Sequence, residues 1–361
     1  MSGISELSDL NERDYIWRLT MKNTYQNSFE INLGHHFILP SLSLGLEPIP
    51  KLLNLQEVEL RNLIYSGLVD IFSKYTITSD NEESTISVDW GNLLDNREDS
   101  NVLSIDIKLN TDRDINPNAR KHYLSYYIEV FFYELFMIFN LSIPGSISLF
   151  QTYFVDNKCK TKFTIGNSCF SNSLEWSNKI GWPKIAYIPI KDVATWYKSL
   201  NIGIRQISKN DLERVIFSLL HVCSDELSSP SGLIWLAHSL ESLFESPKSS
   251  IATTMIKRAF KILGEPEENS KMIRKMFLHF YDLRSRYVHG EFNIHHPSFN
   301  NILDDSIDDY YDQITPSYSI GFSIVLACLQ ILILNNWKGF KFLEEFEGIN
   351  CLIVNNEIVN L

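Results

Sequence analysis

The stretch Tyr281-Asp-Leu-Arg-Ser-Arg-Tyr-Val-His-Gly290 (YDLRSRYVHG) has the pattern of a helix end. Gly290 accepts the left-handed backbone conformation that often closes a helix, so the helix is predicted to stop there. Arg284 and His289 are five residues apart, or about 140° around an ideal helix, so they converge only where the helix ends or distorts. His289 would then lie in the last turn, where the negative end of the helix favours a protonated imidazole.

An arginine and a histidine beside one phosphate suit the cleavage of RNA by its own 2′-hydroxyl. The imidazole can remove the hydroxyl proton or protonate the leaving oxygen, and the guanidinium can hold two oxygens of the charged phosphorane. Because RNA carries its own nucleophile, we expect no metal or other cofactor. The five cysteines also lack a Cys-x-x-Cys pair, standing at Cys159, Cys169, Cys223, Cys328 and Cys351.

Beyond Ile202 the apolar periodicity and the helix caps predict one helix after another. Ser208, with Asp211 three residues on, resembles a capping box, and Gly264 with Pro266 marks a helix stop. The pattern predicts an all-α bundle with helices at Asp211–Cys223, Leu233–Phe244, Ile251–Leu263, Glu267–His289 and Tyr318–Trp337. A polar, acidic interval at 293–312 separates the last two.

The first 201 residues are predicted to form an α+β domain. Val102–Leu109 alternates apolar and polar residues as a half-buried strand does. Weaker strand patterns lie at 83–90, 146–155 and 161–167, and helical patterns at 55–74 and 118–140. The predicted organisation is therefore an α+β domain at 1–201, a helical bundle at 202–345 and a short hairpin or tail at 346–361, helix-rich overall.

The charge pattern limits how this chain could meet nucleic acid. A net charge of −12 and a pI near 5.3 exclude a protein that coats nucleic acid non-specifically. Residues 251–290 nevertheless carry eight Lys and Arg against four Asp and Glu, a local charge of +4. A basic face of this kind is either a solvated surface or a local RNA contact.

One segment has the composition of a membrane span. No charge occurs between Asp312 and Lys338, and the middle of this stretch is strongly apolar. Its serines, Gln330 and the Asn335-Asn336 pair favour a buried core helix, with a membrane-tethered protein as the alternative. Since the opening residues are polar and acidic rather than a signal peptide, we expect a cytoplasmic protein.

Two motifs resemble the Apea-like branch of the HEPN superfamily. The first is Leu240-Glu241-Ser242-Leu243-Phe244, and the second is Leu283-Arg284-Ser285 followed by His289-Gly290. The resemblance covers roughly residues 205 to 340. It implies a helical domain that dimerises, so that Arg-x4-6-His motifs from two protomers meet in one cleft.

Many HEPN proteins are metal-independent endoribonucleases of toxin–antitoxin, abortive-infection and other anti-phage systems. The resemblance implies that Arg284 steadies the transition state and that His289 is the general acid and base, with Glu241 orienting Arg284. It further implies that Arg286 and Tyr287 contact RNA by phosphate pairing and base stacking. The chain departs from many active members at Ser285, where they carry Asn, Asp or His.

The expected function is therefore RNA cleavage leaving a 2′,3′-cyclic phosphate, in anti-phage defence or toxin-like growth arrest. By its position, the domain at 1–201 would be the sensor or specificity element that meets a phage-derived or host trigger. The alternative is a non-catalytic HEPN module that dimerises and binds a nucleotide or RNA.

Overall fold

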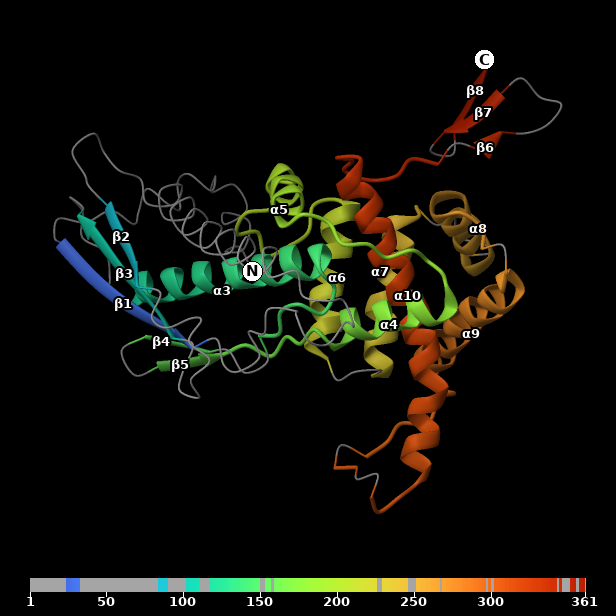
Figure 1. Cartoon of the computed structure of the whole chain (residues 1–361), viewed down its shortest axis with the longest axis horizontal. Coiled ribbons are helices and arrows are strands. Elements are labelled where there is room, and N and C mark those ends of the chain that lie inside the picture. Colours follow the sequence, from blue (N-terminus) through green and yellow to red (C-terminus); the bar gives the residue numbers. More distant parts are fainter. Residues whose placement is uncertain are drawn as a thin grey trace, which may run out of the picture. The chain divides into compact units, whose positions relative to one another are not determined.

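Figure 1 shows the computed structural model of the 361-residue chain. It describes residues 117–149, 153–156, 159–225, 229–245, 251–266, 268–296, 298–299 and 302–342, together with strands at 24–32, 84–89, 102–110, 344–345, 351–354 and 357–360. Backbone contacts divide the chain into two compact units. The N-terminal unit is Met1–Phe139 with Ser146–Thr164, and the helical unit is Asn140–Gly145 with Ile165–Leu361.

The backbone of the N-terminal unit contains an antiparallel sheet. Its strand order is β2-β3-β1-β4-β5, formed by Ser84–Asp89, Val102–Asn110, Thr24–Asn32, Tyr153–Asp156 and Cys159–Lys162. β3, the clearest strand pattern of the sequence, lies between β2 and β1, and its Ile105 is paired with both Val88 and Phe29. The expected helix at 55–74 lies outside the described residues.

Helix α3 (Pro117–Ser142) follows β3 in the chain and supplies the described core of the N-terminal unit. Phe132 is 1% exposed and packs against Phe163, with ring centroids 5.8 Å apart. Tyr133 packs edge-on against the same ring at 5.6 Å. Burying several aromatic rings on one helix gives this unit a large apolar contribution to its stability.

Seven helices form the described part of the helical unit between residues 165 and 342. They are α4 (Ser168–Ile180), α5 (Ile190–Ser199), α6 (Asp211–Ser224), α7 (Pro230–Leu243), α8 (Ile251–Leu263), α9 (Ser270–Val288) and α10 (Ser306–Leu334). The prediction divides the chain after residue 201, whereas the contacts divide it at Ile165, so α4 and α5 belong with the bundle. Both helices are short, at 13 and 10 residues.

Helix α10 is the central helix of this unit and packs against α4, α7, α8 and α9 (Figure 1). It is long and apolar enough to cross a membrane, but 89% of its most apolar 18-residue window is buried inside the protein. Its polar side chains have protein partners there. Gln330 donates to the carbonyl oxygens of Leu141 and Ala186, and Ser323 donates to Ser173. The apolar sequence of α10 is thus accounted for by core packing.

The start of α10 differs from the sequence prediction, which placed it at Tyr318 after an acidic interval. The helix begins at Ser306, twelve residues earlier, and includes Pro316. Asp308 and Asp309 lie in its first turn, where the positive end of the helix stabilises carboxylates. What looked like an acidic linker is therefore partly the N-terminal end of the core helix.

The start of α6 is another correction. The N-cap is Asn210 rather than Ser208, because the Asn210 side chain accepts from the Glu213 N–H at 2.9 Å. Glu213 accepts from the Lys209 N–H, one residue before the cap, at 2.6 Å and from the Asn210 side chain at 2.9 Å. The reciprocal partner is thus Glu213, two residues beyond the expected Asp211.

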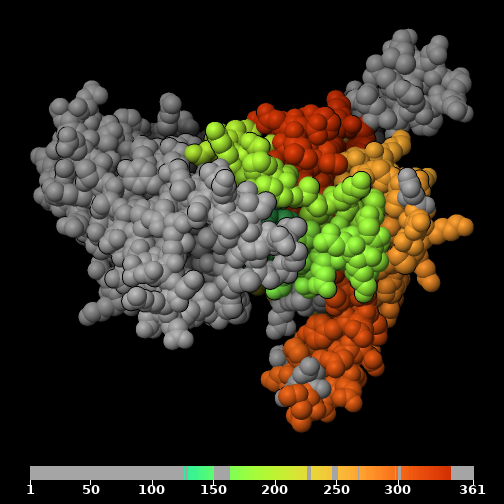
Figure 2. All heavy atoms as spheres, in the orientation of Figure 1, coloured from blue at the N-terminus to red at the C-terminus, as the bar shows by residue number. Residues whose placement is uncertain are grey.

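The chain after α9 projects from the bundle. Residues 291–313, called the arm below, contain the connection from α9 and the first turns of α10, and they extend beyond the packed helices (Figures 1 and 2). At the C-terminal end, β6 (Glu344–Glu345), β7 (Cys351–Val354) and β8 (Glu357–Asn360) form an antiparallel sheet. β7 and β8 flank positions 355–356, where the sequence predicts a hairpin turn.

Candidate functional site

Arg284 is positioned by the buried face of α9. Leu283 and Phe280 are fully buried and fix the rotation of the helix in the bundle. This rotation directs Arg284 toward α7, where its Nη2 lies 3.8 Å from Oε1 of Glu241. The two side chains are 34% and 30% exposed, so the pair is partly accessible to solvent. An ion pair this exposed contributes at most about 1 kcal/mol to stability.

Tyr281 lies one helical turn before Arg284 and is part of the same charged cluster. Its hydroxyl donates to Sδ of Met255 at 3.2 Å. Burial raises the pKa of this phenol well above its ordinary value, the Glu241 carboxylate raises it further, and the Arg284 guanidinium lowers it. Tyr281 therefore remains neutral at physiological pH and forms an uncharged wall beside the Glu241–Arg284 pair.

The guanidinium of Arg284 has unused hydrogen-bonding capacity. Its Nε–H is buried and has no hydrogen-bond partner among the described residues. The Nη2–Oε1 separation of 3.8 Å is also longer than a hydrogen bond. An unpaired buried donor costs about 1–3 kcal/mol. The side chain is 34% exposed, and its Nη groups are not among the buried unpaired atoms, so they are the donors that an incoming phosphate oxygen could reach.

His289 terminates α9 and is exposed to solvent. The backbone N–H of His289 donates to the Ser285 carbonyl at 3.0 Å, and the backbone N–H of Glu291 donates to the Arg286 carbonyl at 2.8 Å. Gly290 has a φ of +75°, so the helix ends in the left-handed glycine conformation that the sequence predicts. The imidazole is therefore accessible where the helix stops, about 7.5 Å along the axis from Arg284.

Arg286 and Tyr287 face the arm. The Arg286 guanidinium lies 5.7 Å from the centre of the Phe292 ring, and Tyr287 packs edge-on against that ring at 6.5 Å. Ser285 is half-exposed between the two groups of contacts. Arg284 therefore lies beside Glu241, whereas Arg286 and Tyr287 both contact Phe292. No hydrogen bond joins Arg284 to His289 within the described part of one chain.

Part of the basic segment at 251–290 has a structural role. The guanidinium of Arg258 donates to the carbonyl of Glu245 at 2.8 Å and covers the ring of Phe342. Arg274 pairs with Glu265 at 2.9 Å and stacks on Phe260. The cations that remain for a ligand on α9 include the exposed Lys271 and Lys275, together with the partly exposed Arg284 and Arg286.

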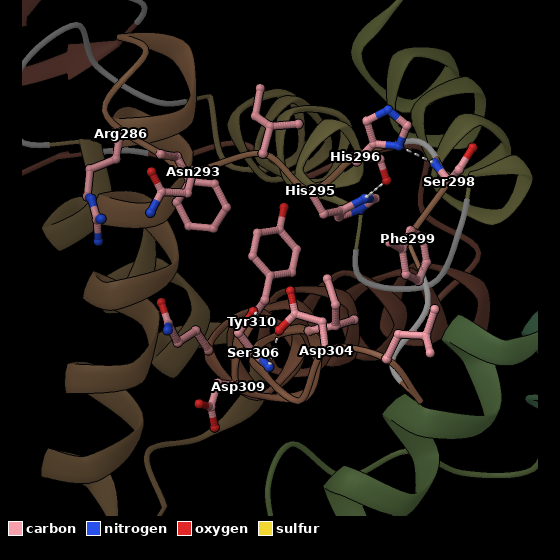
Figure 3. Close-up of a pocket in the computed structure, with 15 residues that line it drawn as sticks. Arg286, Asn293, His295, His296, Ser298, Phe299, Asp304, Ser306, Asp309 and Tyr310 are labelled. Atoms are coloured by element: carbon pink, nitrogen blue, oxygen red, sulfur yellow. Dashed lines mark hydrogen bonds between the residues drawn. The ribbon is translucent and has the colours of Figure 1, made fainter.

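A cavity of about 620 Å³ beside Arg286 was not predicted from the sequence (Figure 3). Its lining includes Phe292, His295, Asp304 and Tyr310, all from the arm. The sequence does show His295, Phe299, Tyr310 and Tyr311 recurring through an otherwise acidic stretch. That recurrence of rings within an acidic stretch is the signal that could have indicated a cavity.

Comparison of the chain with models of known families, with curated proteins and with solved structures finds no match. The functional argument therefore depends on the geometry of the residues themselves. Among the described side chains, no three His, Cys, Asp or Glu residues are grouped so that they could hold a metal ion.

Proposed function

We propose that this protein is a metal-independent endoribonuclease of the HEPN type, with Arg284 and His289 as its catalytic residues. The proposal rests on two side chains near the C-terminal end of α9. Arg284 is a partly exposed guanidinium whose nearest carboxylate oxygen is 3.8 Å away, and His289 is an exposed imidazole where α9 stops. One group is ready to bind a phosphate oxygen and the other to exchange a proton.

In the proposed reaction the 2′-oxygen of the ribose attacks the adjacent phosphorus, and the bond to the 5′-oxygen of the next nucleotide breaks. The His289 imidazole removes the 2′-OH proton, and the imidazolium that results protonates the departing 5′-oxygen, so the RNA ends in a 2′,3′-cyclic phosphate. Arg284 stabilises the charge that builds on the phosphorane. Glu241 holds the guanidinium from the side of α7.

The proposal includes two copies of the chain and a helical domain of the Apea-like HEPN class. An Arg284 from one copy and a His289 from the other would meet in a shared cleft, in a cytoplasmic homodimer. The N-terminal α+β unit would be the sensor or specificity element, answering a phage-derived or host trigger. The setting would be anti-phage defence or growth arrest.

The experiment compares the full-length wild type with Arg284→Ala and His289→Ala on total RNA in the presence of EDTA. We expect each substitution to lower the cleavage rate by roughly 100-fold or more, because each removes one element of transition-state stabilisation or proton transfer. Arg284→Lys should retain only part of the rate, since lysine keeps the charge but loses the fork of donors. A 2′,3′-cyclic phosphate end is identified by its resistance to phosphatase, which is lost after acid opens the ring.

His279→Ala is the matched control, because His279 is an exposed histidine on the same helix ten residues before His289. It should cleave RNA at the wild-type rate. Thermal unfolding should change little in all variants, as the Arg284–Glu241 pair is partly exposed. Equal cleavage by wild type and both catalytic variants would remove the assignment. RNA binding without any cleavage would favour the non-catalytic module instead.

A further inference from the structure

The cavity in the arm adjoins the proposed catalytic residues through α9. Arg286 lines it from the last turn of the helix, and Phe292, three residues after His289, forms part of its wall. Three residues of chain span at most about 11 Å, so the cavity begins close to the imidazole. A volume of about 620 Å³ is in the range of pockets that hold small organic molecules.

The walls of the cavity are flat rings. His295 packs against Phe299 at 4.4 Å and against Tyr310 at 5.2 Å, and Phe292 lies 5.5 Å from Tyr310. Figure 3 shows Tyr310 in the middle of the lining residues, with His295 and Asn293 on either side of its ring. Aromatic faces of this kind stack on unpaired nucleobases.

Asp304 and Tyr310 are two of the polar residues that line the cavity, together with Asn293, Asp309 and Gln313. Oδ1 of Asp304 accepts from the Ser306 N–H at 3.0 Å and from its hydroxyl at 2.6 Å. These bonds lower the pKa of Asp304, so the carboxylate is ionised at neutral pH. Asp304 is exposed, and its Oδ2 accepts no hydrogen bond from the described residues. The Tyr310 hydroxyl is buried and likewise unpaired there.

The charge of the arm selects which part of a nucleotide can enter. Residues 291–312 contain six Asp and Glu and no Lys or Arg. A phosphate would be repelled from this surface, whereas a neutral base would not. Arg286 is the cation at the edge of the cavity, where the phosphate attached to an inserted base could remain.

We propose that this cavity binds an unpaired guanine of the RNA, next to the phosphate that is cut. Guanine presents N1–H and its 2-amino group side by side, and the remaining oxygen of Asp304, Oδ2, can accept from both. Adenine and cytosine each present a single amino group on this edge, and uracil a single N–H. The proposal rests on the proposed function for the nature of the substrate, and it adds the base that the site reads.

The test uses full-length His289→Ala, which should bind RNA without cutting it. Its affinity for fluorescein-labelled UUGUU, UUIUU and UUAUU is measured by fluorescence anisotropy, where inosine (I) is guanosine without the 2-amino group. We expect UUGUU to bind best, by roughly five- to a hundredfold over UUAUU, with UUIUU between them. Adding Asp304→Asn should erase the preference, and Tyr310→Phe should reduce it.

Asp305→Asn is the matched control. Asp305 is exposed, carries the same charge, does not line the cavity and makes no capping bond to α10. It should leave the preference for guanine unchanged. A preference that survives Asp304→Asn, or that Asp305→Asn removes equally, overturns the proposal. So does Asp304-dependent binding of spermidine without any preference among the RNAs, because the cavity would then be a cation site.

The two proposals fail in distinguishable ways. Guanine-selective binding by His289→Ala, together with no RNA cleavage by the wild type, would remove the nuclease but support the cavity. Cleavage that depends on Arg284 and His289, but occurs equally after every base and is unaffected by Asp304→Asn, would support the nuclease and remove the cavity.

Discussion

At the residue scale, Glu213 is an acidic side chain that the fold buries almost completely. It is 1% exposed and accepts from Nη1 of Arg205 at 2.7 Å and from the side chain of Asn210 at 2.9 Å. Its other oxygen accepts from the Lys209 N–H. A buried carboxylate is tolerated only when it is paired and hydrogen-bonded, and these three partners meet that requirement.

The N-cap of α6 gives a prediction that distinguishes Asn210, the observed cap, from Ser208, the cap that the sequence pattern indicated. Asn210→Ala should lower the free energy of unfolding by about 1 kcal/mol, because it removes the acceptor for the Glu213 N–H. Urea denaturation followed by circular dichroism measures the change. Ser208→Ala, which alters the residue that the sequence indicates as the cap, should have a much smaller effect. A larger loss from Ser208→Ala would contradict the observed cap.

The buried cysteines of the helical unit make a second prediction at this scale. Burial raises the pKa of the Cys328 thiol, and burial together with a hydrogen bond to Cys169 raises that of Cys223. Both thiols should stay protonated at pH 8 and react with iodoacetamide far more slowly in the folded protein than in urea. Mass spectrometry of each cysteine peptide reads the rates. Rapid alkylation of Cys328 in the folded protein would show that the core around α10 is not closed.

At the scale of elements, the sequence predicts a helix well where cap, apolar stripe and stop agree. Helix α8 has the bounds that its pattern predicts, and α9 ends where Gly290 indicates. The first three turns of α10 escaped prediction because Pro316 and the acidic run are typical of a linker. Tertiary packing and the helix dipole outweigh those local signals.

The contact between α7 and α10 depends on a glycine. A Cβ added at Gly232 would overlap the hydroxyl of Tyr318 and lie 2.9 Å from its ring carbon Cε2. Tyr318 is 2% exposed and cannot swing away without disturbing the core. Gly232→Ala should therefore lower the free energy of unfolding by about 1–3 kcal/mol, despite the better helix propensity of alanine.

Differential scanning calorimetry measures this loss, which corresponds to a fall in Tm of about 2–4 °C for each kcal/mol. Gly166→Ala is the control, since a Cβ there would meet no atom within 4 Å. Combining Gly232→Ala with Tyr318→Phe removes the overlapping hydroxyl and should restore part of the stability. If Gly232→Ala is as stable as the wild type, α7 and α10 are packed less closely than described.

At the scale of the whole molecule, the candidate site divides into a part that the sequence predicts and a part that it does not. Arg284, His289 and Glu241 lie in short motifs whose helical context is readable from local spacing. The cavity is different, because Asp304 and Tyr310 come together with Phe292 only when the connection after α9 packs against the start of α10. Contacts that depend on how a connection folds leave no fixed spacing in the sequence.

The last prediction concerns the number of chains in the site. Arg284 and His289 would lie about 140° apart on an ideal helix. They share no hydrogen bond within the described part of one chain, so a single copy is a poor phosphate clamp. A dimer that places Arg284 of one copy opposite His289 of the other solves this. We therefore expect a mass near twice 41.8 kDa by light scattering at the concentration of the cleavage assay.

Subunit complementation tests the same idea through activity. Arg284→Ala and His289→Ala chains carrying different tags are co-expressed, and mixed dimers are purified through both tags. Each mixed dimer keeps one intact Arg284 and one intact His289 on opposite chains, so it should recover a measurable part of the wild-type rate that neither variant shows alone. Wild-type chains with the same two tags set the upper limit. Inactive mixed dimers beside active wild-type dimers would mean that each chain uses its own Arg284 and His289, and a site shared between chains would then be ruled out.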